Sequence, residues 1–158
     1  ILRHAKSSWK GEGLSDHQRP LNKRGMRDAP RIGELLREMK LSPDRIISST
    51  AQRARDTASK VADASGFCGT TELSEALYLG RPEDYVHALR NVGNDEYRVL
   101  VVGHNPGLEE LLFGLTGSDT PLPTAALAQV EIDIAHWFEL EPNSSGTLLR
   151  VWRPRELE

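Results

Sequence analysis

The sequence predicts an α/β fold, a three-layer sandwich in which helices cover both faces of a mostly parallel central sheet. Two observations predict it. Short apolar runs typical of strands alternate with segments whose apolar residues have helical spacing. Strands that alternate with helices in this way pair in parallel through right-handed crossovers. A length of 158 residues fits one domain, so we expect residues 1–158 to form a single unit without an internal repeat.

The start of the chain predicts a short first strand. Only Ile1 and Leu2 precede Arg3, whereas an ordinary strand has about five or six residues. We therefore expect the first strand to be truncated at its N-terminus. The polar stretch 10–20 contains two glycines and a proline, which is typical of a loop.

Asn22 is a suitable N-cap for the first helix, which is predicted to run to about Lys40. Pro30 disagrees with this pattern, because a proline lacks the backbone N–H group and should weaken or kink the helix near its first turns. The predicted buried face consists of Ala29, Ile32, Leu35, Leu36 and Met39.

A short buried strand is predicted at residues 45–48, followed by a second helix that Gly66 should end. Pro82 suits the first turn of a third helix. The apolar positions of these two helices are Ala54, Ala58, Val61 and Ala62, then Tyr85, Val86, Leu89 and Val92.

Residues 97–102 form the clearest strand of the sequence. The strand leads through Gly-His-Asn-Pro-Gly at 103–107 into a helix with four leucines on one face, Leu108, Leu111, Leu112 and Leu115. Residues 125–133 and 147–152 show the alternation of strands and are expected to complete the sheet.

The composition excludes several classes of protein. Hydrophobic residues make up 38% and charged residues 27% of the chain, an ordinary globular mixture. We expect a cytoplasmic protein, because the sequence shows neither a signal-peptide pattern nor a long apolar run. The single Cys68 cannot form an intrachain disulfide. A net charge of −3 argues against broad nucleic-acid binding.

Side chains suited to binding phosphate follow three of the predicted strands. Arg3 and His4 end the first strand, Arg53 follows the second, and His104 follows the strand at 97–102. Ligands of such sheets bind beyond the carboxyl ends of the strands. Arginine matches phosphate oxygens bidentately, and histidine serves as nucleophile, acid or donor. We therefore predict phosphoryl transfer, with His4 as nucleophile and a protonated His104 among the groups that balance charge.

Four stretches of the sequence resemble the histidine phosphatase superfamily, and within it the SixA-type phosphohistidine phosphatases. They are Arg-His-Ala at 3–5, Asp-His-Gln-Arg-Pro-Leu-Asn-Lys-Arg-Gly at 16–25, Ser-Ser-Thr-Ala-Gln-Arg-Ala-Arg-Asp-Thr-Ala at 48–58, and Gly-His-Asn-Pro-Gly at 103–107. The resemblance covers nearly the whole chain in the right order. It implies a phosphoglycerate-mutase-like fold without metal or cofactor.

The resemblance also implies roles for individual residues. His4 would accept the phosphoryl group, Arg3 and Arg53 would hold it, and His104 would assist the transfer. Arg19 is similar to a further phosphate-facing arginine of the SixA-type group, although an arginine in a loop is nearly as often simply solvated.

Two departures from the family pattern concern the substrate. Ala5 stands where many members have glycine, and a methyl group there is expected to be tolerated. Other branches supply a carboxylic acid to an alcohol leaving group, but the candidates Glu75, Glu83 and Asp16 are more simply explained as solvated carboxylates. A phosphohistidine tolerates the missing acid, because neutral imidazole leaves readily once protonated. The short span at 68–81 leaves little chain for a lid, which agrees with a phosphorylated protein as substrate.

Three alternatives remain open from the sequence. The chain is a phosphatase of small phosphorylated metabolites, or a module that binds phosphate or phosphoproteins without turnover, or a metal hydrolase with His4 and His104 as ligands. The last is least favoured, because no HExxH or paired CxxC motif is present. Trp9 is expected to be a packing residue rather than part of the pocket rim. The oligomeric state is not predicted.

Overall fold

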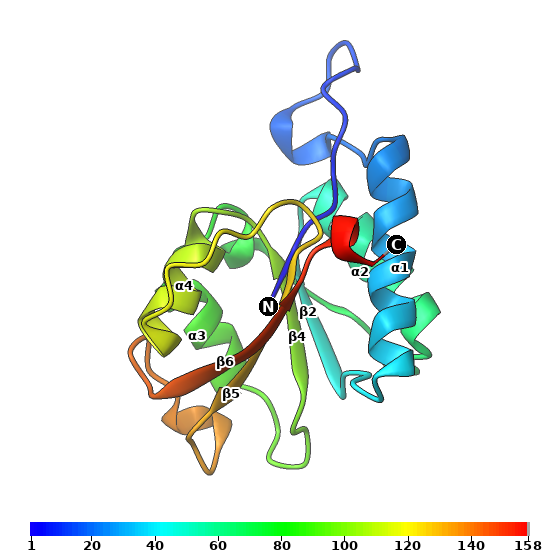
Figure 1. The fold of residues 1–158 in the computed structure, drawn as a ribbon. Coiled ribbons are helices and arrows are strands. Elements are labelled where there is room, and N and C mark those ends of the chain that lie inside the picture. The colour runs from blue at the N-terminus through cyan, green and yellow to red at the C-terminus, as the bar shows by residue number, and fades with distance from the viewer. Residues whose placement is uncertain (158) are drawn as a thin grey trace.

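The computed structural model describes residues 1–157 and shows a six-stranded sheet between two layers of helices (Figure 1). The order of strands in this sheet is β3-β2-β4-β1-β5-β6. The strands are β1 (Leu2–Arg3), β2 (Arg45–Ser49), β3 (Glu72–Ser74), β4 (Val99–Gly103), β5 (Leu127–Ile132) and β6 (Gly146–Trp152).

The sheet is mostly parallel, as predicted. Strands β3, β2, β4 and β1 are paired in parallel. Strand β5 is antiparallel to both β1 and β6. The parallel strands therefore end at the same edge of the sheet, with Ser48 beside Val102 and Arg3 beside Gly103.

The helices form a layer on each face of the sheet, which confirms the predicted three-layer sandwich. Helices α1 and α2 cover one face, and α3 and α4 cover the other (Figure 1). Their bounds are α1 (Lys23–Glu38), α2 (Gln52–Ser65), α3 (Pro82–Arg90) and α4 (Gly107–Thr116). Short 3-10 helices occur at η1 (Asp16–Gln18), η2 (Glu75–Leu77), η3 (Trp137–Glu139) and η4 (Pro154–Glu156).

The hydrophobic core has two parts, one on each side of the sheet. Successive residues of a strand point to opposite faces. Ile46 therefore packs in the cluster under α1 and α2, whereas Ile47 packs in the cluster under α3 and α4. Val102 and Val101 of β4 divide in the same way. This double burial explains why the central strands are continuous apolar runs.

The ends of α1 and α2 follow the sequence signals. The Asn22 side chain accepts a hydrogen bond of 2.9 Å from the backbone N–H of Gly25, and Gly66 ends α2 in the left-handed conformation, with φ of 75°. The expected disturbance at Pro30 does not interrupt α1. Ala29 and Ile32 beside it are fully buried, so packing against α2 outweighs the missing hydrogen bond.

Three strands differ from the sequence expectation, among them β5, which begins at Leu127 rather than at residue 125. β4 begins at Val99 rather than at residue 97, because the backbone N–H groups of Tyr97 and Arg98 donate to Asp44 Oδ2 at 2.9 and 2.8 Å. The short β3 was not predicted. Its first residues, Glu72 and Leu73, are exposed and lack an alternating pattern.

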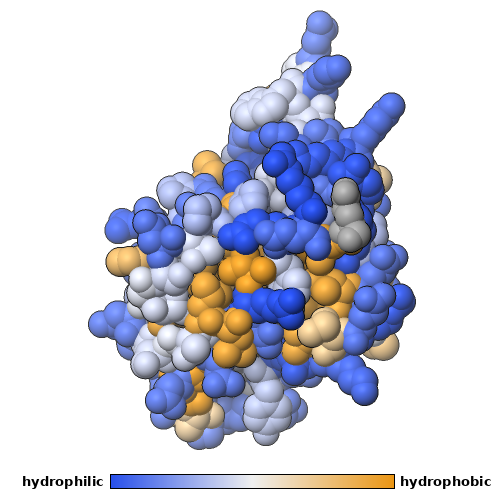
Figure 2. All heavy atoms as spheres, in the orientation of Figure 1, coloured by the Kyte–Doolittle hydropathy of each residue, from blue (hydrophilic) through white to orange (hydrophobic). Residues whose placement is uncertain are grey.

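The short β1 leaves a groove between its two neighbours in the sheet. β1 has two residues, and a groove of about 350 Å³ lies where β4 and β5 continue beyond it, lined in part by Val99, Val101, Leu127 and Val130. Figure 2 shows apolar side chains gathered in the middle of this face and hydrophilic ones around them. Truncation of the first strand stays a prediction. Within residues 1–157 no helix is both long and apolar enough to cross a membrane.

Candidate active site

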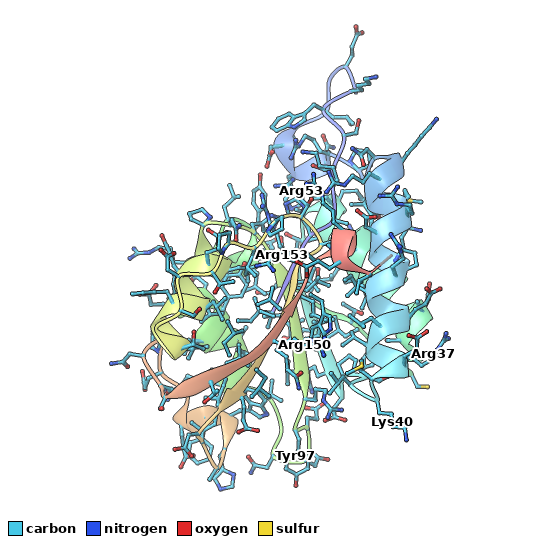
Figure 3. All side chains as sticks on the ribbon, viewed as in Figure 1. Arg37, Lys40, Arg53, Tyr97, Arg150 and Arg153 are labelled. Carbon is cyan, nitrogen blue, oxygen red and sulfur yellow. The ribbon has the colours of Figure 1, made fainter. Side chains whose placement is uncertain are left out.

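The candidate site lies at the carboxyl ends of β1, β2 and β4. The backbone N–H of His4 donates to the carbonyl of Gly103 over 3.0 Å, which joins the ends of β1 and β4. Figure 3 shows Arg53 at this end of the molecule and Tyr97, which precedes β4, at the opposite end. The three strand ends that the sequence singled out therefore converge.

A pocket of about 220 Å³ opens between these strand ends. The structure brings all five predicted site residues into its wall. The lining residues are Arg3, His4, Lys6, Ser7, Trp9, Arg19, Arg53, Leu79, His104, Asn105 and Thr124.

His4 presents an unprotonated nitrogen to this pocket. Its Nδ1 lies 2.8 Å from the carbonyl oxygen of Ala5. A carbonyl only accepts hydrogen bonds, so Nδ1 carries the ring proton and Nε2 keeps its lone pair. Burial, with Arg53, Arg3 and Arg19 nearby, lowers the pKa of His4 to about 4, although the bond to Ala5 opposes the shift. The ring is therefore neutral near pH 7.

Arg53 joins His4 to the loop before α1. Its Nε lies 3.4 Å from His4 Nε2. Its two terminal nitrogens donate to Asp16, Nη1 to the backbone carbonyl at 2.7 Å and Nη2 to Oδ2 at 3.1 Å. The side chain is 4% exposed. Arg53 is thus held rigidly beside the predicted nucleophile.

His104 is held from two sides. Its backbone N–H donates to the Tyr85 hydroxyl at 3.1 Å, and its Nε2 lies 2.7 Å from Ser49 Oγ. The His104 and His4 rings lie 5.1 Å apart. Burial, followed by repulsion from His4 in its protonated form and from the Arg53 guanidinium, lowers the pKa of His104 to about 3. His104 is therefore neutral in this structure, unlike the protonated ring expected from the sequence. A phosphate dianion would raise its pKa by opposite charge.

Arg3 and Arg19 complete the cationic wall. Arg3 Nη1 donates to the Leu122 carbonyl at 2.9 Å. The guanidinium carbon of Arg19 lies 3.4 Å from the ring centroid of Trp9, and Arg19 Nε lies 3.2 Å from Asp16 Oδ1. The Arg19 side chain is only 11% exposed, so the simple solvated-loop explanation is wrong. Trp9 was expected to pack internally, yet it is 77% exposed at the pocket rim.

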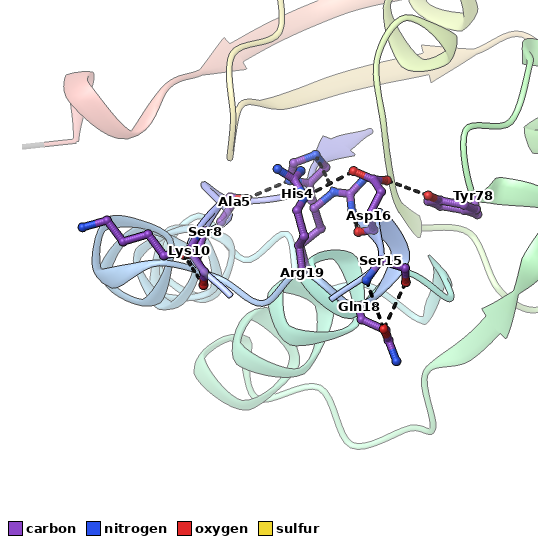
Figure 4. A network of polar contacts seen from close by, with 10 residues as sticks. His4, Ala5, Ser8, Lys10, Ser15, Asp16, Gln18, Arg19 and Tyr78 are labelled. Carbon is purple, nitrogen blue, oxygen red and sulfur yellow. Dashed lines mark hydrogen bonds and ion pairs between the residues drawn. The ribbon is translucent and has the colours of Figure 1, made fainter. Parts of the chain in front are cut away.

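Asp16 and Tyr78 form a contact that the sequence did not predict. The Tyr78 hydroxyl donates to Asp16 Oδ2 at 2.5 Å, as Figure 4 shows together with His4 and Arg19. This bond, and then Arg53 and Arg19, lowers the pKa of Asp16 although partial burial opposes the shift. Asp16 is therefore an ionised bridge between the two arginines rather than a proton donor. No local signal marks Tyr78, which lies 62 positions away along the chain.

The other two carboxyl candidates stand apart from the site. Glu75 and Glu83 are exposed and do not line the pocket, in agreement with the view that they are solvated. In the part of the chain described here, no group of three or more His, Cys, Asp or Glu residues is arranged to hold a metal ion.

Ala5 fits the site without the conformational freedom of glycine. Its backbone is not among those with positive φ in residues 1–157. Its N–H donates to Thr57 Oγ1 at 2.9 Å, and the residue is fully buried. The methyl group is thus accommodated beside the nucleophile.

Buried polar atoms without a protein partner concentrate in this pocket. Across residues 1–157 every such side-chain atom belongs to a residue of the pocket wall. Arg19 Nε is within ion-pair distance of Asp16 but outside hydrogen-bond geometry. The atoms are Arg3 Nε, Arg19 Nε and Nη1, His104 Nδ1 and Asn105 Oδ1. All but the last are nitrogen atoms that can donate hydrogen bonds, an arrangement suited to a polyanionic group.

Comparison with known proteins agrees with this geometry. The family profile described as histidine phosphatase superfamily, branch 1, matches residues 1–78. An uncharacterised Mycobacterium tuberculosis protein is 33% identical over 92% of this chain and 95% of its own. Phosphohistidine phosphatase SixA of Escherichia coli is 29% identical over 84% of each chain.

An Agrobacterium tumefaciens protein has been named as a phosphohistidine phosphatase, SixA. Its crystal structure superposes on this chain with a TM-score of 0.80. It is 30% identical, and the match covers 97% of this chain and 95% of that one. The predicted phosphoglycerate-mutase-like fold is thereby confirmed. The chain belongs to the histidine phosphatase superfamily.

Proposed function

We propose that this protein is a phosphohistidine phosphatase that carries the transferred phosphoryl group on Nε2 of His4. One observation carries the proposal: His4 holds its proton on Nδ1, which leaves Nε2 unprotonated, 3.4 Å from Arg53 Nε, within a pocket that contains unpaired hydrogen-bond donors. The likeness to proteins named as phosphohistidine phosphatases supports the choice of substrate.

In the first half of the reaction, Nε2 of His4 attacks phosphorus in line with the leaving nitrogen. The new P–N bond forms as the old one breaks, and the departing imidazole takes the electron pair of the broken bond. The unpaired donors of Arg3, Arg19 and His104 would bind the phosphoryl oxygens. Such fixed donors stabilise developing charge without needing to reorganise.

In the second half, water attacks phosphorus and the bond to Nε2 breaks. The Ala5 carbonyl keeps the proton on Nδ1 of His4 throughout. Phosphorylated His4 is therefore protonated on its other nitrogen, and it leaves as neutral imidazole while the water oxygen and its protons stay with the phosphate product. The Ala5 carbonyl would therefore do more than orient the His4 ring, because it also keeps His4 in the form that leaves as neutral imidazole.

The carboxylates of the site favour a nitrogen leaving group over an alcohol. Asp16 has a lowered pKa, so it is ionised near neutral pH and cannot donate a proton to an alkoxide. Glu75 and Glu83 lie outside the pocket wall. General acid catalysis contributes about 10²–10⁴-fold, and protonated phosphoimidazole needs no such help.

An exposed rim supports a phosphorylated protein as the substrate. Trp9 is 77% and Leu79 58% exposed, and both line the pocket. The span before α3 contains only β3 and η2, which leaves little chain for a lid. A histidine side chain on another protein could therefore reach the pocket.

The test compares hydrolysis of a phosphohistidine peptide with that of p-nitrophenyl phosphate, with a chelator present and no added metal. The parent protein should prefer the peptide and form an acid-labile phosphoenzyme. The His4→Ala variant should lose both activity and labelling, whereas the His87→Ala variant, changed at an exposed histidine of α3, should keep them.

Each alternative has its own signature in this experiment. Preference for the ester would indicate a metabolite phosphatase. Phosphate affinity without turnover of either substrate would indicate a binding module. Activity that the chelator abolishes and zinc or magnesium restores would indicate a metal hydrolase.

A further inference from the structure

Asn105 lines the pocket but takes no part in the reaction proposed for His4. Its side-chain nitrogen Nδ2 donates to Glu109 Oε1 at 2.8 Å and to the Leu122 carbonyl at 2.9 Å. Both N–H groups of the amide are thus used. Turning the amide over would place Oδ1 against two acceptors, so the orientation of the side chain is fixed.

The amide is also tied to the arginine wall of the pocket. The Leu122 carbonyl accepts from Arg3 Nη1 as well as from Asn105 Nδ2, both at 2.9 Å. Glu109 Oε1 accepts in addition from the backbone N–H of Leu122 at 2.7 Å. Four hydrogen bonds around Glu109 and Leu122 therefore hold Asn105 in a constant position relative to Arg3.

Oδ1 of Asn105 differs from every other unpaired atom of the pocket. It is buried and has no partner among residues 1–157. A buried unpaired acceptor costs about 1–3 kcal/mol, so a bound group should satisfy it. A deprotonated phosphoryl oxygen cannot, because it carries lone pairs rather than a hydrogen. The partner that matches it is an N–H or O–H donor, which a substrate can supply.

We propose that Asn105 Oδ1 accepts a hydrogen bond from an N–H group of the leaving group, which makes Asn105 a specificity residue for phosphoryl–nitrogen substrates. The inference rests on the proposed function and names its substrate class more closely. A phosphorylated imidazole in its reactive form has an N–H group on the nitrogen that does not bear phosphorus. The leaving oxygen of a phosphate monoester carries no hydrogen.

This contact requires no proton transfer to Asn105. As the P–N bond breaks, the electron pair moves to the leaving nitrogen, and the N–H bonded to Oδ1 stays on the ring. Neutral imidazole departs. The hydrogen bond favours the protonated form of the substrate, which is the form that reacts.

The test measures kcat/KM for phosphoimidazole, whose leaving ring carries an N–H group on the nitrogen that does not bear phosphorus, and for p-nitrophenyl phosphate, whose leaving oxygen carries no hydrogen. The Asn105→Ala variant should lower the phosphoimidazole-to-ester ratio of kcat/KM about three- to tenfold, which corresponds to the loss of one hydrogen bond. The Glu109→Gln variant keeps an acceptor for Asn105 and should leave the ratio within about twofold. Inhibition by inorganic phosphate reports whether each variant retains the folded pocket.

Equal losses on both substrates would overturn the inference, because Oδ1 would then act in a common step such as the attack of water. An unchanged ratio in a folded variant would overturn it too. A parent protein inactive on both substrates would instead contradict the proposed function.

If the Asn105→Ala variant does not fold, a comparison of two substrates with the parent protein tests the inference instead. Phosphoimidazole is compared with its N-methylated analogue, each rate divided by the spontaneous rate. If the parent enhances the hydrolysis of both compounds by the same factor, Asn105 Oδ1 does not accept a hydrogen bond from the leaving group.

Discussion

The hydroxyl of Ser49 lies 2.7 Å from Nε2 of His104, and this contact fixes which nitrogen of the ring carries the proton. Ser49 Oγ accepts a hydrogen bond of 3.2 Å from the backbone N–H of Ala51. Within residues 1–157, the remaining hydroxyl proton has one acceptor in reach, Nε2 of His104. The neutral ring therefore carries its own hydrogen on Nδ1, the nitrogen without a protein partner.

In the Ser49→Ala variant, His104 should no longer be restricted to the Nδ1–H tautomer. We expect two-bond ¹⁵N–¹H spectra to show the Nδ1–H form of His104 in the parent and a mixture in the variant. kcat/KM should fall about three- to tenfold, since one hydrogen bond to the phosphoryl group is no longer preset.

The matched control is Ser48→Ala. Ser48 is equally buried, but its hydroxyl donates to the Ser49 carbonyl and does not contact His104. A parent spectrum with the proton on Nε2, or a control with the same tautomer change, would contradict the assignment.

Asp16 should contribute stability that depends on pH. The hydrogen bond from Tyr78, then the charges of Arg53 and Arg19, hold the pKa of Asp16 below 3.8. The unfolded chain thus takes up this proton first on acidification. The contribution is present above about pH 4 and is lost as pH falls through the folded pKa. We expect Asp16→Asn to melt at a lower temperature than the parent at pH 7, and this difference to shrink as the pH falls below 3.8.

The exposed Asp95 provides the control for this comparison. The Asp95→Asn variant should match the parent at both values of pH. A difference between Asp16→Asn and the parent that is as large at pH 3 as at pH 7 would show that the carboxylate charge is not the source.

The fold was predictable where burial determines the sequence pattern. The strands at the centre of the sheet are apolar because both of their faces are covered, and the helices show one apolar face each. β3 escaped prediction because its position at the edge of the sheet leaves Leu73 exposed and requires no pattern. Backbone bonding to Asp44, a contact absent from any local pattern, moved the start of β4.

The part of the candidate site that was predictable from the sequence consists of phosphate-binding residue types near the ends of strands. His104 follows β4 directly and Arg53 lies in the first turn of α2, shortly after β2, so the topology places both beside His4. The Asp16–Tyr78 contact and the position of Trp9 over Arg19 depend on how loops fold back. The tautomers of both histidines depend on single carbonyl and hydroxyl groups, which no sequence pattern shows.

His4 should make the folded state sensitive to acid. Burial lowers the pKa of His4 from 6.5 to about 4, so between these values the unfolded chain binds the proton and the folded protein does not. Stability therefore falls as pH drops from about 6.5 towards 4, by an amount of the order of 3 kcal/mol. The neutral His4→Gln variant should lose less stability over this range, as measured by urea unfolding. If His4→Gln and the exposed-site control His87→Gln follow the parent curve equally, His4 is not the titrating group.

Ala5 should be replaceable by glycine without loss of activity. Its backbone does not have positive φ, and its N–H bond to Thr57 does not involve the methyl group. We expect kcat and KM of Ala5→Gly to stay within about twofold, while the free energy of unfolding falls by about 1 kcal/mol through the lost buried methyl and the added chain entropy. A clear rise in kcat would show instead that the methyl group narrows the pocket.

Trp9 should act on phosphate binding through Arg19. The guanidinium carbon of Arg19 lies 3.4 Å from the Trp9 ring centroid, and a cation–π contact at an exposed site contributes about 0.5–1 kcal/mol. We expect Trp9→Ala to raise KM for a phosphohistidine peptide about two- to fivefold with little change in kcat. Trp9→Tyr should restore most of the affinity, since tyrosine also offers a ring face. In the Arg19→Ala background Trp9→Ala should have no further effect; an equal rise in KM there would show that Trp9 contacts the substrate directly.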